Sequence, residues 1–180
     1  MFFAGMARQP RENLGNSFYH VINRGNRRFQ IFENSKDYRL FENILFDAIN
    51  KFSTDLLAYC LMPNHWHLMF YTHQDGELSD LMKWIGNAHT RRYHKIKGTI
   101  GTGPIYQGRF KSVATTDDEQ LHSTIRYIER NPIQAGLIEK AADWRWSSAW
   151  WYQSRPEDFS SLFCEDRFRR GNDWLLHVDS

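Results

Sequence analysis

The chain has 180 residues, of which 41% are hydrophobic and 16% aromatic, enough for one globular domain with a buried core. Its formal charge of +2 is too small to establish a polyanionic partner, and its two cysteines exclude both a disulfide framework and a cysteine-only zinc cage. No run approaches the roughly 20 apolar residues of a membrane span, so we expect a cytoplasmic protein with no membrane partner.

Hydrophobic periodicity and turn residues divide the chain into eight segments before a tryptophan-rich tail. In chain order the pattern predicts a flexible arm (1–16), a strand (17–23), a helix capped by Ser35 that ends at residue 52, and two hairpin strands (55–62 and 65–71). It then predicts a helix that begins at Leu78 and includes the basic residues at 91–95, a strand (107–115), and a helix capped by Asp117 or Asp118 that ends near Asn131.

The order of these elements is β-α-β-β-α-β followed by a further helix. This order predicts an α+β fold of the ferredoxin-like split βαβ type, a four-stranded antiparallel sheet with helices on one face and its first and third strands at the centre. We expect the domain to span residues 17–150, with residues 151–180 packing on or near it.

Two histidines begin the second hairpin strand. Because side chains alternate faces along a strand, His65 and His67 point to one face and Trp66 to the other. Two imidazoles on one rigid face can hold half the coordination sphere of a metal ion, although a His-x-His pair in a strand is more often structural. The sequence therefore needs a further ligand before it predicts a metal site.

Basic residues dominate the middle of the chain. The segment from Leu81 to Thr116 contains no Asp or Glu, which is an electrostatic footprint for phosphates. Its basic residues are Lys83, Arg91, Arg92, Lys95, Lys97, Arg109 and Lys111. A second group, beside the aromatic Phe29, combines bidentate donors with a stacking surface and suits unpaired bases; its members are Arg24, Asn26, Arg27 and Arg28.

Two tyrosines are candidates for a nucleophile. Tyr127 shares a helix face with Asn131, four residues later, and this face differs from that of the buried apolar stripe. A phenolate beside a two-histidine metal could attack phosphorus and stay covalently attached, helped by the metal or by Arg130. Tyr93 has basic neighbours and competes for the role, and the ordinary role of a helical tyrosine is packing. Composition does not choose between them.

Four motifs in the same order resemble the REP-associated tyrosine transposases, domesticated relatives of the single-tyrosine HUH transposases of small insertion sequences. They lie at residues 62–68 (MPNHWHL), 106–112 (YQGRFKS), 126–137 (RYIERNPIQAGL) and 144–148 (WRWSS). The loop at residues 24–28 (RGNRR) also resembles the N-terminal signature of that family.

The resemblance implies an endonuclease and strand transferase that uses Mg²⁺ or Mn²⁺ on single-stranded, REP-like hairpin DNA. By position, it implies that His65 and His67 bind the metal and that Tyr127 forms a 5′-phosphotyrosine link and releases a 3′-OH. Where the insertion-sequence relatives have a metal-binding glutamine this chain has Asn131, with Glu129 or water as substitutes. Two histidines plus an oxygen ligand suit Mn²⁺ better than Mg²⁺.

The same resemblance bears on partners and assembly. It implies a nucleoid-associated bacterial protein that assembles its site in one chain, so we expect a monomer. Two other classes stay open: a non-catalytic ferredoxin-like module that binds single-stranded nucleic acid, and a replication-initiator-type HUH nickase. The first would leave the two histidines and Tyr127 without a role, and the second usually carries a further domain that 180 residues cannot hold.

Overall fold

A computed structural model describes residues 13–115 and 117–180. Its sheet has four strands in the order β2-β3-β1-β4, with every neighbouring pair antiparallel. The strands and helices are β1 (Ser17–Arg24), η1 (Asn26–Arg28), α1 (Ser35–Phe52), β2 (Asp55–Met62), β3 (His65–Thr72), α2 (Glu77–Lys97), β4 (Lys111–Thr115), α3 (Asp118–Gln134), η2 (Ala141–Asp143), α4 (Ser148–Ser154), α5 (Pro156–Leu162) and α6 (Trp174–Asp179).

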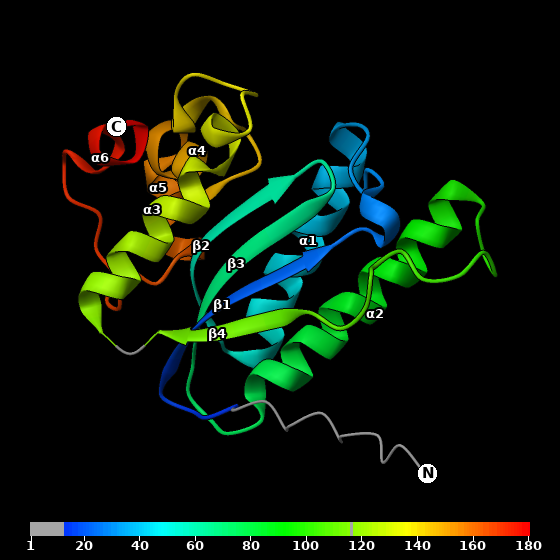
Figure 1. The fold of residues 1–180 in the computed structure, drawn as a ribbon. Coiled ribbons are helices and arrows are strands. Elements are labelled where there is room, and N and C mark those ends of the chain that lie inside the picture. Colours follow the sequence, from blue (N-terminus) through cyan, green and yellow to red (C-terminus); the bar gives the residue numbers. More distant parts are fainter. Residues whose placement is uncertain (1–12, 116) are drawn as a thin grey trace, which may run out of the picture.

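The sheet confirms the predicted α+β fold, with β1 and β3 at its centre. The two helices of the split βαβ, α1 and α2, lie together on one face, and the space between them and the sheet holds the larger apolar core (Figure 1). From β3 this core receives Trp66, Leu68 and Phe70, the alternate positions of the strand. Alternation along this central strand thus sends every second side chain into the larger core.

The further helix, α3, lies on the opposite face. It packs over β2 together with the C-terminal helices, which gather at the same end of the sheet (Figure 1). Leu121, Ile125 and Ile128 of α3 meet Met69 of β3 in a second apolar core. The core under α1 and α2 matches the predicted arrangement with helices on one face. The core under α3 covers the other face only near β2, so that face stays uncovered over β1 and β4.

Two helix ends differ from the predicted ones. The N-cap of α1 is Asn34 rather than Ser35, because the Asn34 side chain accepts from the backbone N–H groups of Lys36 and Asp37. Helix α3 is capped by Asp117, one of the two predicted caps, and runs past Pro132 to Gln134. Pro132 has no N–H to donate to the carbonyl of Ile128. The side-chain amide of Asn131 donates to that carbonyl instead, and also to the carbonyl of Tyr127.

The fourth strand is shorter than predicted. It begins at Lys111, because residues 107–110 leave the ladder after Tyr106 makes an isolated bridge to Gly25. Val113, expected to add an apolar contact, is 59% exposed, since it lies on the uncovered face of the sheet.

Most of the predicted flexible arm, residues 1–12, lies outside the described residues. The last part of it is held against the loop that follows β3. Asn13 accepts from the Gly76 N–H at 2.9 Å, and the Gly15 N–H donates to Asp75 at 2.7 Å. Residues 13–16 are therefore part of the folded body.

The free edge of β2 is covered by the C-terminal third of the chain. The backbone of Leu61 donates to Trp146, that of Cys164 donates to Leu56, and the Trp144 indole donates to the Leu61 carbonyl. These bonds satisfy backbone groups that would otherwise template pairing with another chain. Within the described residues, no helix combines the length and apolar character needed to cross a bilayer.

The buried His89 of α2 makes the fold sensitive to acid. Burial lowers its pKa to about 3, against about 6.5 in an unfolded chain. The unfolded chain therefore takes up a proton below pH 6.5 that the folded chain excludes, so stability is full above pH 6.5 and is lost as the pH falls toward 3. Between pH 7.5 and 5.0 we expect this residue to cost about 1–2 kcal/mol.

Urea denaturation of His89→Phe at both pH values checks this, because the variant should lose less stability than the wild type over the same interval. The exposed His177→Asn variant is the control and should follow the wild type. An equal pH dependence in His89→Phe and wild type would contradict the assignment.

Candidate metal and nucleophile site

The uncovered face of the sheet brings three histidines together. Antiparallel pairing sets Ile22 of β1 opposite His67 of β3, and Arg24 opposite His65. His20, two residues before Ile22, projects from the same face, and its ring stacks on that of His67 with centroids 5.2 Å apart. The rings of His65 and His67 have centroids 5.0 Å apart. The sheet therefore presents a compact group of imidazoles.

Burial keeps this group neutral at pH 7. Removal from water lowers the pKa of His65 to about 4, with a further contribution from the Arg24 guanidinium. Removal from water also lowers the pKa of His67 to about 2, and the neighbouring imidazoles and Arg24 act in the same direction. Neutral imidazole is the form that binds a metal ion.

Asn64 fixes the tautomer of His65. Its amide nitrogen donates to the Arg28 carbonyl at 3.4 Å, which leaves its oxygen 2.6 Å from Nδ1 of His65. An amide oxygen can only accept, so Nδ1 of His65 carries the proton and Nε2 keeps a free lone pair. The loop before the strand thus leaves Nε2 of His65 free to bind a metal ion.

The ring of His67 also has a nitrogen available for a metal. Its Nε2 is one of four buried side-chain nitrogen or oxygen atoms without a hydrogen-bond partner in the described ranges 13–115 and 117–180. An orphaned buried polar atom is costly unless a ligand uses it. The donor set, two neutral imidazole nitrogens, fits a divalent cation.

The two histidines do not complete a metal site by themselves. Among the described residues, no three His, Cys, Asp or Glu side chains group so that they could hold a metal ion. A remaining ligand must therefore come from another residue type, from water or from the substrate.

Tyr127 lies beside the histidines. Its ring centroid is 5.6 Å from that of His67 and 6.1 Å from that of His20, edge to face in both pairs. The side chain is 44% exposed although it borders a buried site. A phenol that is both next to the imidazoles and open to solvent can meet a large substrate.

Tyr93, the competing tyrosine, belongs to the opposite side of the sheet. It is 8% exposed in the larger core, where it contacts His89 and Phe29. The sheet therefore separates Tyr93 from the histidine pair, and of the two candidate tyrosines Tyr127 is the one beside it.

The two predicted third ligands behave differently. The Asn131 amide nitrogen donates to carbonyls of its own helix, which leaves its oxygen without a hydrogen bond in the described structure. Glu129 is fully buried among groups from the C-terminal segment: its carboxylate accepts from Ser148 at 2.6 Å, from Arg170 at 2.6 Å and from the Trp174 indole at 2.7 Å. Both Glu129 oxygens are thus bonded within the fold, which favours Asn131 over Glu129 as the third ligand.

The loop that resembles the family signature adjoins the site. The Gly25 N–H donates to the Asn64 carbonyl and the Asn26 N–H to the Ile105 carbonyl, both at 2.8 Å, so the loop is tied to the hairpin turn. A Cβ on Gly25 would lie 2.5 Å from the Phe29 carbonyl oxygen, which explains the glycine. Arg27 and Arg28 are exposed on this loop.

A pocket of about 450 Å³ opens where β1 ends and β4 begins. Its lining includes Arg24, Arg109 and Lys111, with the amides Asn23 and Gln107. Because Arg24 is paired with His65 in the sheet, this basic pocket adjoins the histidine pair. Cations and amides so placed can bind a phosphate and an adjacent base.

The other predicted DNA contacts are spread over the molecule. Arg91, Arg92 and Lys95 are exposed on α2, across the sheet from the histidines. Two further residues predicted to contact DNA, Lys97 and Arg130, also make contacts within the fold. Lys97 bonds Glu33 at 2.8 Å and Asp37 at 3.0 Å with only 20% of its side chain exposed. The Arg130 guanidinium donates to the Ser180 carbonyl at 2.8 Å.

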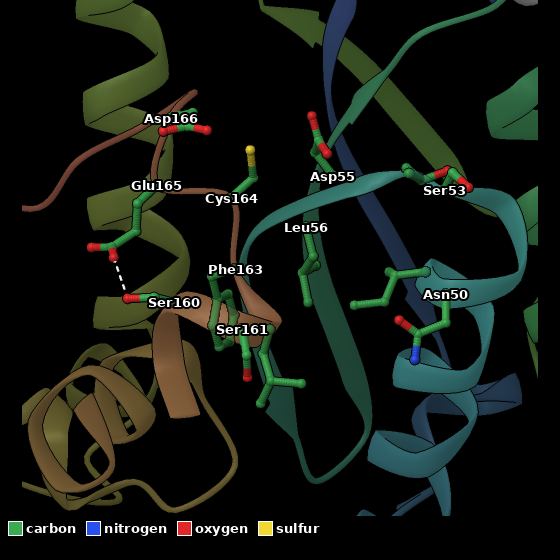
Figure 2. Close-up of a pocket in the computed structure, with 13 residues that line it drawn as sticks. Asn50, Ser53, Asp55, Leu56, Ser160, Ser161, Phe163, Cys164, Glu165 and Asp166 are labelled. Carbon is green, nitrogen blue, oxygen red and sulfur yellow. Dashed lines mark hydrogen bonds between the residues drawn. The ribbon is translucent and has the colours of Figure 1, made fainter. Parts of the chain in front are cut away.

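A second pocket, of about 550 Å³, lies away from this site, between the end of α1, the start of β2 and residues 160–166 (Figure 2). Its charged lining is acidic, from Asp55, Glu165 and Asp166, and the Ser160 hydroxyl donates to Glu165. Such a lining repels phosphates, so this pocket does not suit nucleic acid.

Sequence reasoning missed His20, Asn64 and Arg170. His20 lies in a segment correctly predicted as a strand. Only the register in which β1 pairs with β3 shows that its side chain points to the same face as His65 and His67. Asn64 was assigned to a turn, where Asn is ordinary. Arg170 had no signal, because its partner Glu129 is 41 residues away in the chain.

The chain belongs to the IS200-like transposase family, whose model matches residues 13–131. It is 25% identical over 126 residues to a Haemophilus influenzae protein provisionally named a REP-associated tyrosine transposase, covering 59% of this chain and 72% of that protein. A solved structure of a REP-associated tyrosine transposase bound to a REP hairpin aligns at 20% identity with a TM-score of 0.65 and 88% of each chain covered, so the two share a fold. These matches confirm the family resemblance.

The buried Arg170–Glu129 pair should carry much of the stability of the α3 contact. Removing one partner of a buried ion pair leaves the other charge uncompensated, so Arg170→Met should destabilise the fold by about 3–5 kcal/mol in urea denaturation. The double variant Arg170→Met with Glu129→Gln should recover part of this loss, because no buried charge remains.

The exposed pair of Arg155 with Asp158 is the matched control. Its Arg155→Met variant should change stability by less than about 1 kcal/mol. If Arg170→Met were as mild as Arg155→Met, the buried pair would not hold α3.

Proposed function

We propose that the protein is a metal-dependent endonuclease and strand transferase that acts on single-stranded DNA through Tyr127. The observation that carries the proposal is the exposed Tyr127 ring 5.6 Å from His67 on the uncovered face of the sheet. A nucleophilic side chain next to two neutral imidazoles is the geometry that phosphodiester transfer through a covalent intermediate requires.

In the proposed reaction, the Tyr127 oxygen attacks the phosphorus of the scissile phosphodiester. A tyrosyl O–P bond forms while the bond from phosphorus to O3′ breaks, giving a 5′-phosphotyrosine and a 3′-OH. The phenol loses one proton to water, and the leaving O3′ gains one. Strand transfer is the reverse reaction with a different 3′-OH, so the bond energy is conserved in the phosphotyrosine link.

A divalent cation, Mn²⁺ or Mg²⁺, when bound by His65 and His67, supplies positive charge to the scissile phosphate. The Asn131 oxygen is the proposed third ligand, because its amide nitrogen is already committed to α3 carbonyls. Imidazole ligands favour Mn²⁺ over Mg²⁺, which prefers all-oxygen coordination.

Hairpin DNA of the REP type is the proposed partner. The support is the family match, the H. influenzae relative named as REP-associated and the related fold seen with a REP hairpin. We assign phosphates near the scissile bond to Arg24, Arg109 and Lys111, and unpaired bases to Asn26, Arg27 and Arg28. Arg91, Arg92 and Lys95 on α2 could meet only more distant parts of the DNA.

Covalent trapping tests the reaction. With Mn²⁺ and a labelled single-stranded hairpin oligonucleotide, the wild type should give a protein–DNA adduct on a denaturing gel. Tyr127→Phe should give none, because the attacking oxygen is gone, and Tyr93→Phe is the matched control that should keep the adduct. EDTA or His67→Ala should reduce the adduct at least 100-fold, since charge neutralisation at the phosphate is lost.

The outcomes separate the proposed function from its alternatives. Adduct in Tyr127→Phe and not in Tyr93→Phe would overturn the choice of nucleophile. Tight hairpin binding by the wild type without adduct at any metal concentration would instead identify a binding module.

We also propose that one chain forms the whole site. Helix α3 packs on β2 of its own chain, and the same chain supplies Arg170 to its Glu129. Multi-angle light scattering should therefore give a mass near 21.5 kDa. A mass near twice this value, together with mixed dimers of His67→Ala and Tyr127→Phe that regain adduct formation, would contradict assembly within one chain.

A further inference from the structure

His20 of β1 has a specific partner in the site. Its Nε2 lies 2.9 Å from Nδ1 of His67, a hydrogen-bond distance, and the two rings are stacked at an interplanar angle of 21°. Two neutral imidazole nitrogens at this distance share one proton, so one ring donates and the other accepts. The direction of this bond decides what the rest of the His67 ring can do.

Only one direction leaves His67 able to bind a cation. If His20 donated, the proton of His67 would sit on Nε2, a buried atom for which the described structure has no acceptor. If His67 donates from Nδ1, its Nε2 carries a free lone pair instead, and the remaining proton of His20 sits on Nδ1 of a partly exposed residue, where water can accept it. The second arrangement leaves no buried N–H unpaired.

His20 does not itself act as a ligand in this arrangement. Its Nε2 is occupied by the proton of His67, and the described His, Cys, Asp and Glu side chains form no three-membered group that could hold a metal ion. The acceptor role is the one that Asn64 performs for His65 at 2.6 Å. Each candidate ligand thus has an acceptor at Nδ1 and a lone pair at Nε2.

We propose that His20 is a positioning residue that accepts the Nδ1–H of His67 and so presents Nε2 of His67 to the divalent cation. Naming the cation as the ligand rests on the proposed function, whereas the hydrogen bond does not. Acceptors at the far nitrogen of a ligating imidazole fix its tautomer and ring orientation, and their loss typically costs about 10–100-fold in metal affinity.

Imidazole nitrogen shifts in the metal-free protein test the hydrogen bond directly. In long-range ¹H–¹⁵N spectra at pH 7.5, His67 should be the Nδ1–H tautomer in the wild type and in His20→Gln, whose amide oxygen can accept the same proton. In His20→Phe, which keeps a stacked ring without an acceptor, His67 should shift toward the Nε2–H tautomer. His94, whose Nδ1 bonds Thr99, is the internal control and should not change.

Calorimetric titration with Mn²⁺ tests the consequence. His20→Phe should bind about 10–100-fold more weakly than the wild type, and His20→Gln within about threefold of it. Should His20→Phe fail to fold, as judged by circular dichroism, His20→Leu provides a second acceptor-free variant.

An Nε2–H tautomer of His67 in the wild type would overturn the proposal, as would an unchanged tautomer in the acceptor-free variants. Equal Mn²⁺ affinity in wild type and acceptor-free variants would overturn it as well. If the wild type binds neither Mn²⁺ nor Mg²⁺ while the His67 tautomer responds to His20 as described, the proposed function fails and the hydrogen-bonding role of His20 stands.

Discussion

The alternation of side chains along β3 is the constraint on which the rest of the structure depends. Trp66 and Leu68 enter the core under α1 and α2, and this burial forces His65 and His67 to the opposite face. A slip of one residue in the pairing of β1 with β3 would bury the histidines and expose Trp66. The hydrophobic core therefore specifies the position of the polar site.

The electrostatic environment of the uncovered face favours neutral imidazoles. Its imidazoles are buried deeply enough to stay neutral, and Arg24 beside them reinforces that state. An unpaired buried nitrogen on His67 costs stability in the free protein. Three other buried side-chain atoms of the described residues also lack a partner, but Nε2 of His67 lies in the ring beside those of His65 and Tyr127, where a bound ligand would satisfy it.

Residues outside the family match hold α3, the helix that carries Tyr127. The match ends at Asn131, yet α3 is anchored through Glu129 by Ser148, Arg170 and Trp174 from the C-terminal segment. The same segment covers the edge of β2. Its packing thus fixes the position of Tyr127 relative to the histidines, although none of its residues belongs to the site.

Much of this architecture follows from local sequence patterns. Hydrophobic periodicity gives the element order and the central position of β1 and β3. The alternation of side chains puts His65 and His67 on one face, and capping chemistry places the start of α3 at Asp117 or Asp118. The exact ends of α1 and α3 did not, because Asn34 competed with Ser35 and because the Asn131 side chain allowed α3 to pass Pro132.

Among the site residues, the sequence by itself determined the histidine pair, since two residues apart on a strand must share a face, and the family motif supplied Tyr127. Only the tertiary structure decided that Tyr127 rather than Tyr93 lies beside His67, that Glu129 and Lys97 serve the fold, and that His20 joins the site. The physical reason is the same in each case. These roles depend on which distant segment meets each side chain, and that is fixed by strand register and core packing rather than by neighbours in the chain.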